Sequence, residues 1–165
     1  MVIDEKAIKL QKGDIIIMTE MLFLLVALVA GIAMAIQGSL NSVLGEITGL
    51  WEANFVVHVI GTSLIAIIIF LLNLNKGDFG NLVEAPWYVY VGGVLNVIII
   101  YTVVVTIPKL GVANATASII FGQVTTAAII DHFGFWGLDA VPFHWTKLAG
   151  VILLAAGAKL VLNTG

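Results

Sequence analysis

Five long apolar stretches alternate with polar breaks along the chain. A helix that crosses about 30 Å of hydrocarbon needs about 20 mainly apolar residues, and the stretches reach or approach that length. Strands of a membrane barrel alternate in polarity, which these stretches do not, and open sheets leave backbone groups unpaired in lipid. The pattern therefore predicts an all-α integral membrane protein. Its expected transmembrane helices cover residues 21–44, 51–74, 87–107, 112–130 and 145–162.

The breaks between the stretches have the chemistry of turns. Residues 45–52 combine two glycines with two acids, and 73–86 is polar and ends at a proline that suits a first helical turn. Residues 107–111 hold a proline, a lysine and a glycine, and 131–145 form a longer aromatic link. Tryptophans and tyrosines stand at the expected helix ends, where their rings favour the headgroup layer.

Composition narrows the class of protein further. Apolar residues make up 61% of the 165 positions and charged residues only 10%, against about 25% in a soluble domain. This excludes an ordinary soluble enzyme. The chain has no cysteine, which excludes thiolate metal sites, and its net charge of −3 without any arginine argues against nucleic-acid binding.

Residues 1–20 differ from the expected five-helix transmembrane domain at 21–165. They carry three of the seven lysines and four of the ten acids. We expect an N-terminal tail or a short interfacial helix here, with Met18 and Met21 as alternative starts of the chain. Ala33-Met34-Ala35 also matches a signal-peptide cleavage site, although four further apolar stretches follow it.

The lysines of the expected transmembrane domain give almost no orientation signal. Lys76 and Lys147 fall on one side of the membrane, and Lys109 and Lys159 fall on the other. The tail would make the count five against two and favour a cytoplasmic N-terminus. Without it, the balance permits insertion both ways and hence an antiparallel dimer, or it reflects only a small protein with few lysines.

Four amide side chains interrupt the apolar stretches. Polar groups inside a span usually face a partner helix or a cavity. Gln37 and Asn41 are four residues apart and so share a helix face, while Asn96 and Gln123 fall near the middle of their spans. We predict that the four line a central substrate site. Interhelical hydrogen bonding is the competing interpretation.

Two titratable residues of the second span are candidates for proton coupling. His58 is the one histidine expected inside a span, and the ordinary histidine pKa of about 6.5 suits proton exchange. Glu52 lies six residues earlier, or about 9 Å along a helix. A packed, hydrogen-bonded histidine is the alternative for His58.

Small residues recur at spacings that let helix backbones approach closely. The first span shows both a seven-residue glycine repeat and a small-xxx-small pair. We predict helix packing, including dimer packing, at Gly31, Gly38, Ser42, Gly45, Gly122, Gly150 and Gly157.

Signatures of enzymes are missing from the sequence. The metalloprotease, phosphate-loop and nucleophile-elbow motifs are absent, and no serine has the setting of a nucleophile. We therefore expect no enzymatic activity, no cofactor and no metal.

Several motifs together resemble the YdcZ-type family of half-size, five-helix inner-membrane proteins in the drug/metabolite transporter superfamily. They are GIAMAIQGSLNSVLG at 31–45, GT at 61–62, PWY…GG at 86–93, PKLG at 108–111 and GQ…DHFG at 122–134. The resemblance covers about residues 21–162. It implies a ten-helix transporter unit built from two five-helix halves of opposite orientation, and it implies no substrate.

Sequence therefore predicts a multi-pass protein of a bacterial or archaeal inner membrane. We expect a secondary transporter, an exporter of a small metabolite or drug-like solute, working by alternating access as an antiparallel homodimer or with a paired homologue. A small dual-topology ion channel and an accessory subunit of a heteromeric transporter are the alternatives.

Overall fold

The computed structural model describes residues 5–72, 77–142 and 144–163, and side chains from residue 15 onward. All regular structure in these ranges is helical, which confirms the all-α fold class. Five helices are long and apolar enough to cross a membrane. They are Ile15–Thr48, Leu50–Leu71, Trp87–Leu110, Val112–Phe133 and Trp145–Leu162. The chain divides into two units, Met1–Gln37 and Gly38–Gly165, which are described separately below.

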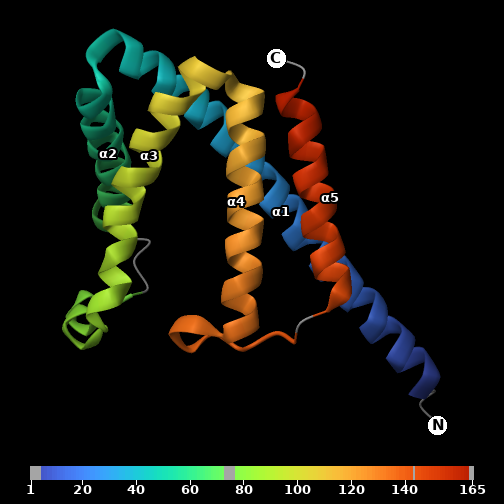
Figure 1. The fold of residues 1–165 in the computed structure, drawn as a ribbon. Helices are drawn as coiled ribbons and strands as arrows, with labels where there is room; N and C mark the ends of the chain where they lie inside the picture. The colour runs from blue at the N-terminus through green and yellow to red at the C-terminus, as the bar shows by residue number, and fades with distance from the viewer. Residues whose placement is uncertain (1–4, 73–76, 143, 164–165) are drawn as a thin grey trace. The chain divides into compact units, whose positions relative to one another are not determined.

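The first unit consists of the larger part of helix α1, which runs from Glu5 to Thr48 (Figure 1). The helix is longer at both ends than the expected span at 21–44. Its N-terminal extension at residues 5–20 holds three lysines, two glutamates and four isoleucines and lacks proline, so its one glycine is the only weak helix former in it. A membrane-surface position for residues 1–20 stays a prediction.

A single residue, Gly49, joins α1 to α2 (Leu50–Ala66). Gly49 has φ of 102°, a conformation that side chains with a Cβ rarely adopt. The turn expected across residues 45–52 is thus confined to one glycine, because the residues on both sides keep helical hydrogen bonds.

Gly111, with φ of 80°, likewise forms the whole link between α3 (Val91–Leu110) and α4 (Val112–Phe133). The third span continues past its expected end at residue 107 and includes Pro108. A proline so close to the helix end removes one backbone hydrogen bond without ending the helix.

The other two links are longer. After α2 the backbone widens into a π-helical turn, η1 (Ile67–Leu71), and residues 73–74 of the expected second span lie outside the described residues. Two 3-10 turns, η2 (Phe79–Glu84) and η3 (Trp87–Tyr90), then lead into α3. The Tyr90 hydroxyl donates a hydrogen bond to the Leu82 carbonyl and holds these turns together.

The link from α4 to α5 (Trp145–Leu162) begins at Gly134, whose left-handed conformation ends α4. The turn η4 (Phe135–Gly137) follows, and the Val141 amide donates to the Asp131 carbonyl at 2.8 Å, which folds the link back onto α4. Helix α5 has the bounds expected from sequence.

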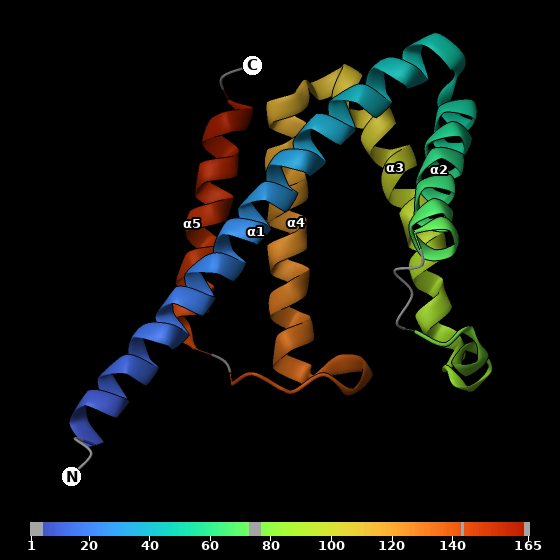
Figure 2. The ribbon, with the colours of Figure 1, turned by 180° about the vertical axis from the view of Figure 1, so that it is seen from behind.

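Neighbouring helices of the second unit pack in chain order, α2 on α3, α3 on α4 and α4 on α5. Both ribbon views show the one-residue links and the C-terminal end of α5 at one end of this unit (Figure 1, Figure 2). We call this the short-link end. The opposite, long-link end holds the α2–α3 and α4–α5 connections.

The buried residues belong to the last turns of α1, the start of α2, the second half of α3 and the start of α4. They are Asn41, Ser42, Ala53, Asn54, Ile100, Val104, Ile107 and Ala115. Glycines permit this close packing. A Cβ on Gly38 would stand 3.1 Å from Val103 Cγ1, and one on Gly45 would stand well inside 3.0 Å of Val104 Cγ1. Most other side chains of the spans are exposed, as expected for surfaces that face lipid or a partner.

Candidate functional site

Three polar residues of α2 and α3 form a hydrogen-bonded cluster. The Asn54 side-chain amide donates to the Val97 carbonyl at 2.9 Å and so ties α2 to α3. One turn further along α2, His58 Nδ1 lies 2.8 Å from the Asn54 backbone carbonyl, and its Nε2 lies 3.0 Å from Asn96 Nδ2. The structure thus brings Asn96 and His58 together.

The hydroxyl groups of the spans contrast with these amides. Several of them donate to carbonyls of their own helices, as serine and threonine in helices commonly do. Examples are Thr102, Thr106, Ser118 and Thr125, with hydrogen bonds of 2.6–3.0 Å. Asn54 and Asn96, in contrast, make hydrogen bonds to groups on a neighbouring helix.

Gln123 lies at the middle of α4 on an exposed face. In the described part of the chain its amide has no hydrogen-bond partner. A shallow hollow runs along this face and is lined by Ser118, Ile119, Gly122, Gln123, Thr126, Ala127 and Ile130.

The remaining two amides lie elsewhere. Asn41 is buried, with 7% of its surface exposed, among the α1 residues that pack on α3. Gln37 is exposed in the first unit. The convergence of all four amides on one site stays a prediction, because in the described part of the second unit no hydrogen bond joins Asn41, Asn96 or Gln123 to another of them.

Glu52 stands in the first turn of α2 at the short-link end. Its carboxylate lies against Gly49, in the space that a Cβ on that glycine would take. Beside it, Trp51 stacks on Tyr101 of α3 with ring centroids 4.7 Å apart. Glu52 and His58 are therefore six residues, or about 9 Å, apart along one helix, without direct contact.

The small residues selected from sequence fall into two groups. Gly38, Ser42 and Gly45 lie where α1 packs on α3. The others have open space where a Cβ would stand, judged for Gly31 within its own unit and over the described residues. They are Gly31, Gly122, Gly150 and Gly157.

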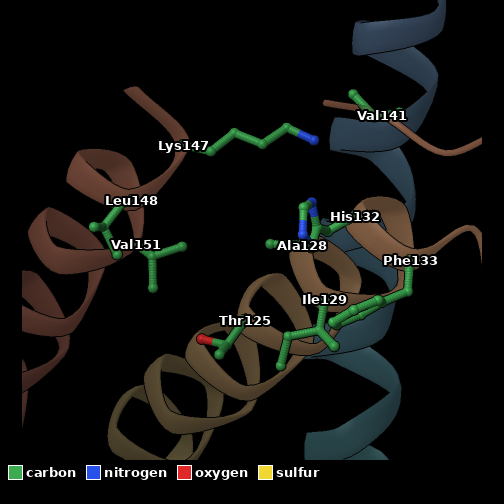
Figure 3. Close-up of a pocket in the computed structure, with 9 residues that line it drawn as sticks. All are labelled: Thr125, Ala128, Ile129, His132, Phe133, Val141, Lys147, Leu148 and Val151. Carbon is green, nitrogen blue, oxygen red and sulfur yellow. The ribbon is translucent and has the colours of Figure 1, made fainter. Parts of the chain in front are cut away.

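A pocket between α4 and α5 opens at the long-link end (Figure 3). Its walls are mostly apolar, and Thr125, His132 and Lys147 are its polar lining residues. Figure 3 shows Lys147 extending from α5 across the pocket. Its ammonium nitrogen lies 2.9 Å from Asp131 Oδ2 on α4, and both side chains are partly exposed.

Sequence reasoning missed two of these features. Asn54 lies four residues before His58, the same spacing that drew attention to Gln37 and Asn41, so that signal was present in the sequence. The ion pair of Asp131 with Lys147 had no such signal, because its partners lie 16 residues apart on different helices.

Five apolar spans that carry amides and a histidine are typical of a multi-pass membrane protein. The family described as "Putative inner membrane exporter, YdcZ" matches residues 22–160, and the chain belongs to this family. The resemblance noted from the motifs is thereby confirmed. Neither the curated proteins nor the solved structures contain a match to the chain.

Family membership makes the chain an inner-membrane protein of an exporter family. It also supports the expectation that the chain is not an enzyme.

Proposed function

We propose that the chain is a secondary exporter of a small metabolite or drug-like solute. In this proposal two copies of opposite orientation form the ten-helix working unit and transport by alternating access. Gln37, Asn41, Asn96 and Gln123 contact the solute, and His58 with Glu52 links transport to protons.

One observation carries the proposal: Gln123 is exposed near the middle of an apolar span, and its amide has no hydrogen-bond partner in the described part of the chain. An amide without a partner in an apolar medium costs about 2–7 kcal/mol. Lipid provides no partner, so the Gln123 amide needs a second protein surface or a water-filled cavity. A dimer with a central solute site supplies both.

The distribution of lysines supports opposite orientations. Lys109 and Lys159 lie at the short-link end of the second unit, and Lys147 lies at the long-link end. Lys76 lies outside the described residues, and the order of the spans predicts it on the same side as Lys147. The open surface at Gly122, Gly150 and Gly157 offers small-residue contacts for a partner helix.

Cysteine labelling tests the orientation directly, because the natural chain has no cysteine. Asn163→Cys marks the short-link end and Asp139→Cys marks the long-link end. In intact cells a membrane-impermeant maleimide should label a fraction of each variant, and permeabilisation should expose the remainder. Complete labelling of one variant with none of the other would establish a single orientation and refute the antiparallel homodimer.

Transport is tested with the full chain in proteoliposomes that contain a pH-sensitive dye. Amino acids, organic acids, nucleosides and sugars are added across a pH gradient, and a transported solute should give saturable proton movement. Gln37→Ala and Gln123→Leu should abolish that movement while the dimer persists in detergent. Val124→Leu is the matched control, since Val124 is the exposed neighbour of Gln123 on α4.

Other results would favour the alternatives. Full activity in both glutamine variants would refute the amide site. A current that does not saturate would indicate an ion channel. Flux that appears only when a homologous chain is added would indicate an accessory subunit.

A further inference from the structure

The geometry around His58 determines which imidazole nitrogen carries the hydrogen in the neutral side chain. Nδ1 lies 2.8 Å from the Asn54 backbone carbonyl, and a carbonyl oxygen only accepts hydrogen bonds. Nδ1 must therefore be the N–H donor. In the neutral ring Nε2 is then a bare acceptor, and it receives a hydrogen bond from the Asn96 amide 3.0 Å away.

Protonation of His58 reverses the polarity of this contact. The added proton has one free position, Nε2, and the imidazolium then presents an N–H to the Asn96 amide nitrogen. Two donors would face each other. Rotation of the Asn96 amide by about half a turn puts Oδ1 in the acceptor position, and the broad two-fold torsion of an asparagine side chain permits this without backbone movement.

Asn54 holds α2 and α3 in register while the Asn96 amide rotates. It is 3% exposed, and its side chain binds the carbonyl of Val97, the residue next to Asn96. Its own backbone carbonyl holds His58 Nδ1 in both protonation states. Asn54 is thus a positioning residue that sets the α2–α3 register on which the contact depends.

No other titratable group of α2 or α3 intervenes at this contact. On α2 the described residues add only Glu52, about 9 Å toward the short-link end. On α3 they add Tyr101, which stacks on Trp51, and Lys109 in the last turn. Tyr88 and Tyr90 in η3 lie toward the long-link end, away from Lys109.

We propose that Asn96 is a specificity switch whose outward edge is set by the protonation state of His58. With neutral His58, Asn96 turns its carbonyl oxygen outward and selects solutes that present N–H or O–H donors. With protonated His58, it turns its NH₂ group outward and selects solutes that present carbonyl or carboxylate acceptors. The switch rests on the proposed exporter function only for this last step, because the hydrogen-bond reversal needs no solute.

Nuclear magnetic resonance on the full chain in detergent micelles tests the reversal. Nitrogen-15 shifts of the imidazole identify the protonated nitrogen, and the variant His132→Asn/His144→Asn leaves His58 as the only histidine. If that variant does not fold, the His58 signals are assigned by their loss in His58→Gln. The neutral ring should show the Nδ1–H form, and the protonated ring should carry hydrogen on both nitrogens.

The side-chain amide signals of Asn96 should shift along the same titration curve as His58. Gln123 is the matched control, since its amide on α4 has no contact with the ring and should not follow that curve. An Nε2–H form at high pH would overturn the proposal. An Asn96 signal that stays fixed while His58 titrates would also overturn it.

Transport separates the switch from the exporter function. In proteoliposomes the preference between donor-rich and acceptor-rich solutes of the panel should change with pH in the natural chain. Any transport that remains in Asn96→Leu or His58→Gln should no longer show that change. If no solute is transported but the two titrations coincide, the exporter function fails and the hydrogen-bond reversal stands. If transport occurs and its preference ignores pH, the specificity role of Asn96 is refuted.

Discussion

Replacing Gly45 by alanine should destabilise the fold because of one contact. The added Cβ would stand well inside 3.0 Å of Val104 Cγ1, whereas carbon atoms pack at about 3.5–4.0 Å. Val104 is fully buried, so it has no empty space to turn into. The helices must separate, and overpacking of this kind typically costs about 1–3 kcal/mol.

A second effect acts in the opposite direction and must be removed by a control. Alanine is favoured over glycine inside a helix by about 1 kcal/mol. Gly61 on α2 has open space at its Cβ position, so Gly61→Ala should show this gain alone. The difference between the two variants should therefore isolate a loss of about 1–3 kcal/mol at Gly45.

Unfolding of the full chain in mixed detergent micelles, followed by circular dichroism, measures these free energies. Val104→Ala removes the obstructing methyl groups and should restore part of the stability lost in Gly45→Ala. A favourable coupling of about 0.5–3 kcal/mol is expected for residues in such direct contact. Gly38→Ala should fall between the two glycine variants, because its nearest contact is 3.1 Å. Equal stabilities of Gly45→Ala and Gly61→Ala, or purely additive effects with Val104→Ala, would refute the reasoning.

Three further predictions concern the ends of the helices. Gly134→Ala should lower the unfolding free energy by at least about 1–2 kcal/mol, since φ is 60° there and a Cβ would stand 2.7 Å from the Leu138 carbonyl oxygen; a loss below the measurement error would contradict this. Asp131→Asn should cost no more than about 1 kcal/mol, because the ion pair with Lys147 is partly exposed, and a much larger loss would show that lipid or a partner desolvates the pair. Changing Lys159 to glutamine should shift the maleimide labelling of Asn163→Cys toward the non-cytoplasmic side, and unchanged labelling would show that the residual lysines do not set orientation.

Sequence predicted the helices well because membrane spans obey a strong length and polarity rule. Helix α5 has its expected bounds, and the two tight turns lie within the breaks where they were expected. The exact turn residues were not predictable from composition. Pro108 lies inside α3 and Gly111 outside it, because a proline is tolerated in a last turn while a positive φ requires glycine.

The site was predictable only in part. Asn96 and His58 were selected on polarity alone, and their contact depends on the α2–α3 register, which no local pattern encodes. The packing role of each glycine was likewise not predictable from the sequence. Gly45 and Gly122 look equivalent in the sequence, but only the first meets a neighbouring helix in a single copy. Sequence alone does not distinguish a glycine that packs within the chain from one left open for a partner, because the difference depends on which residues lie opposite it in the fold.

The one-residue links at Gly49 and Gly111 place pivot points at the short-link end of the second unit. Helices joined by one residue can tilt about that point but cannot separate there, whereas longer links allow their far ends to move apart. Helix α3 has 20 residues and is about 30 Å long, so a tilt of about 10° displaces its far end by about 5 Å. In the proposed antiparallel pair, each membrane face would hold the short-link end of one copy, where the helices pivot, and the long-link end of the other copy, where they move. A single stretch of sequence would then serve as the gate on both sides of the membrane.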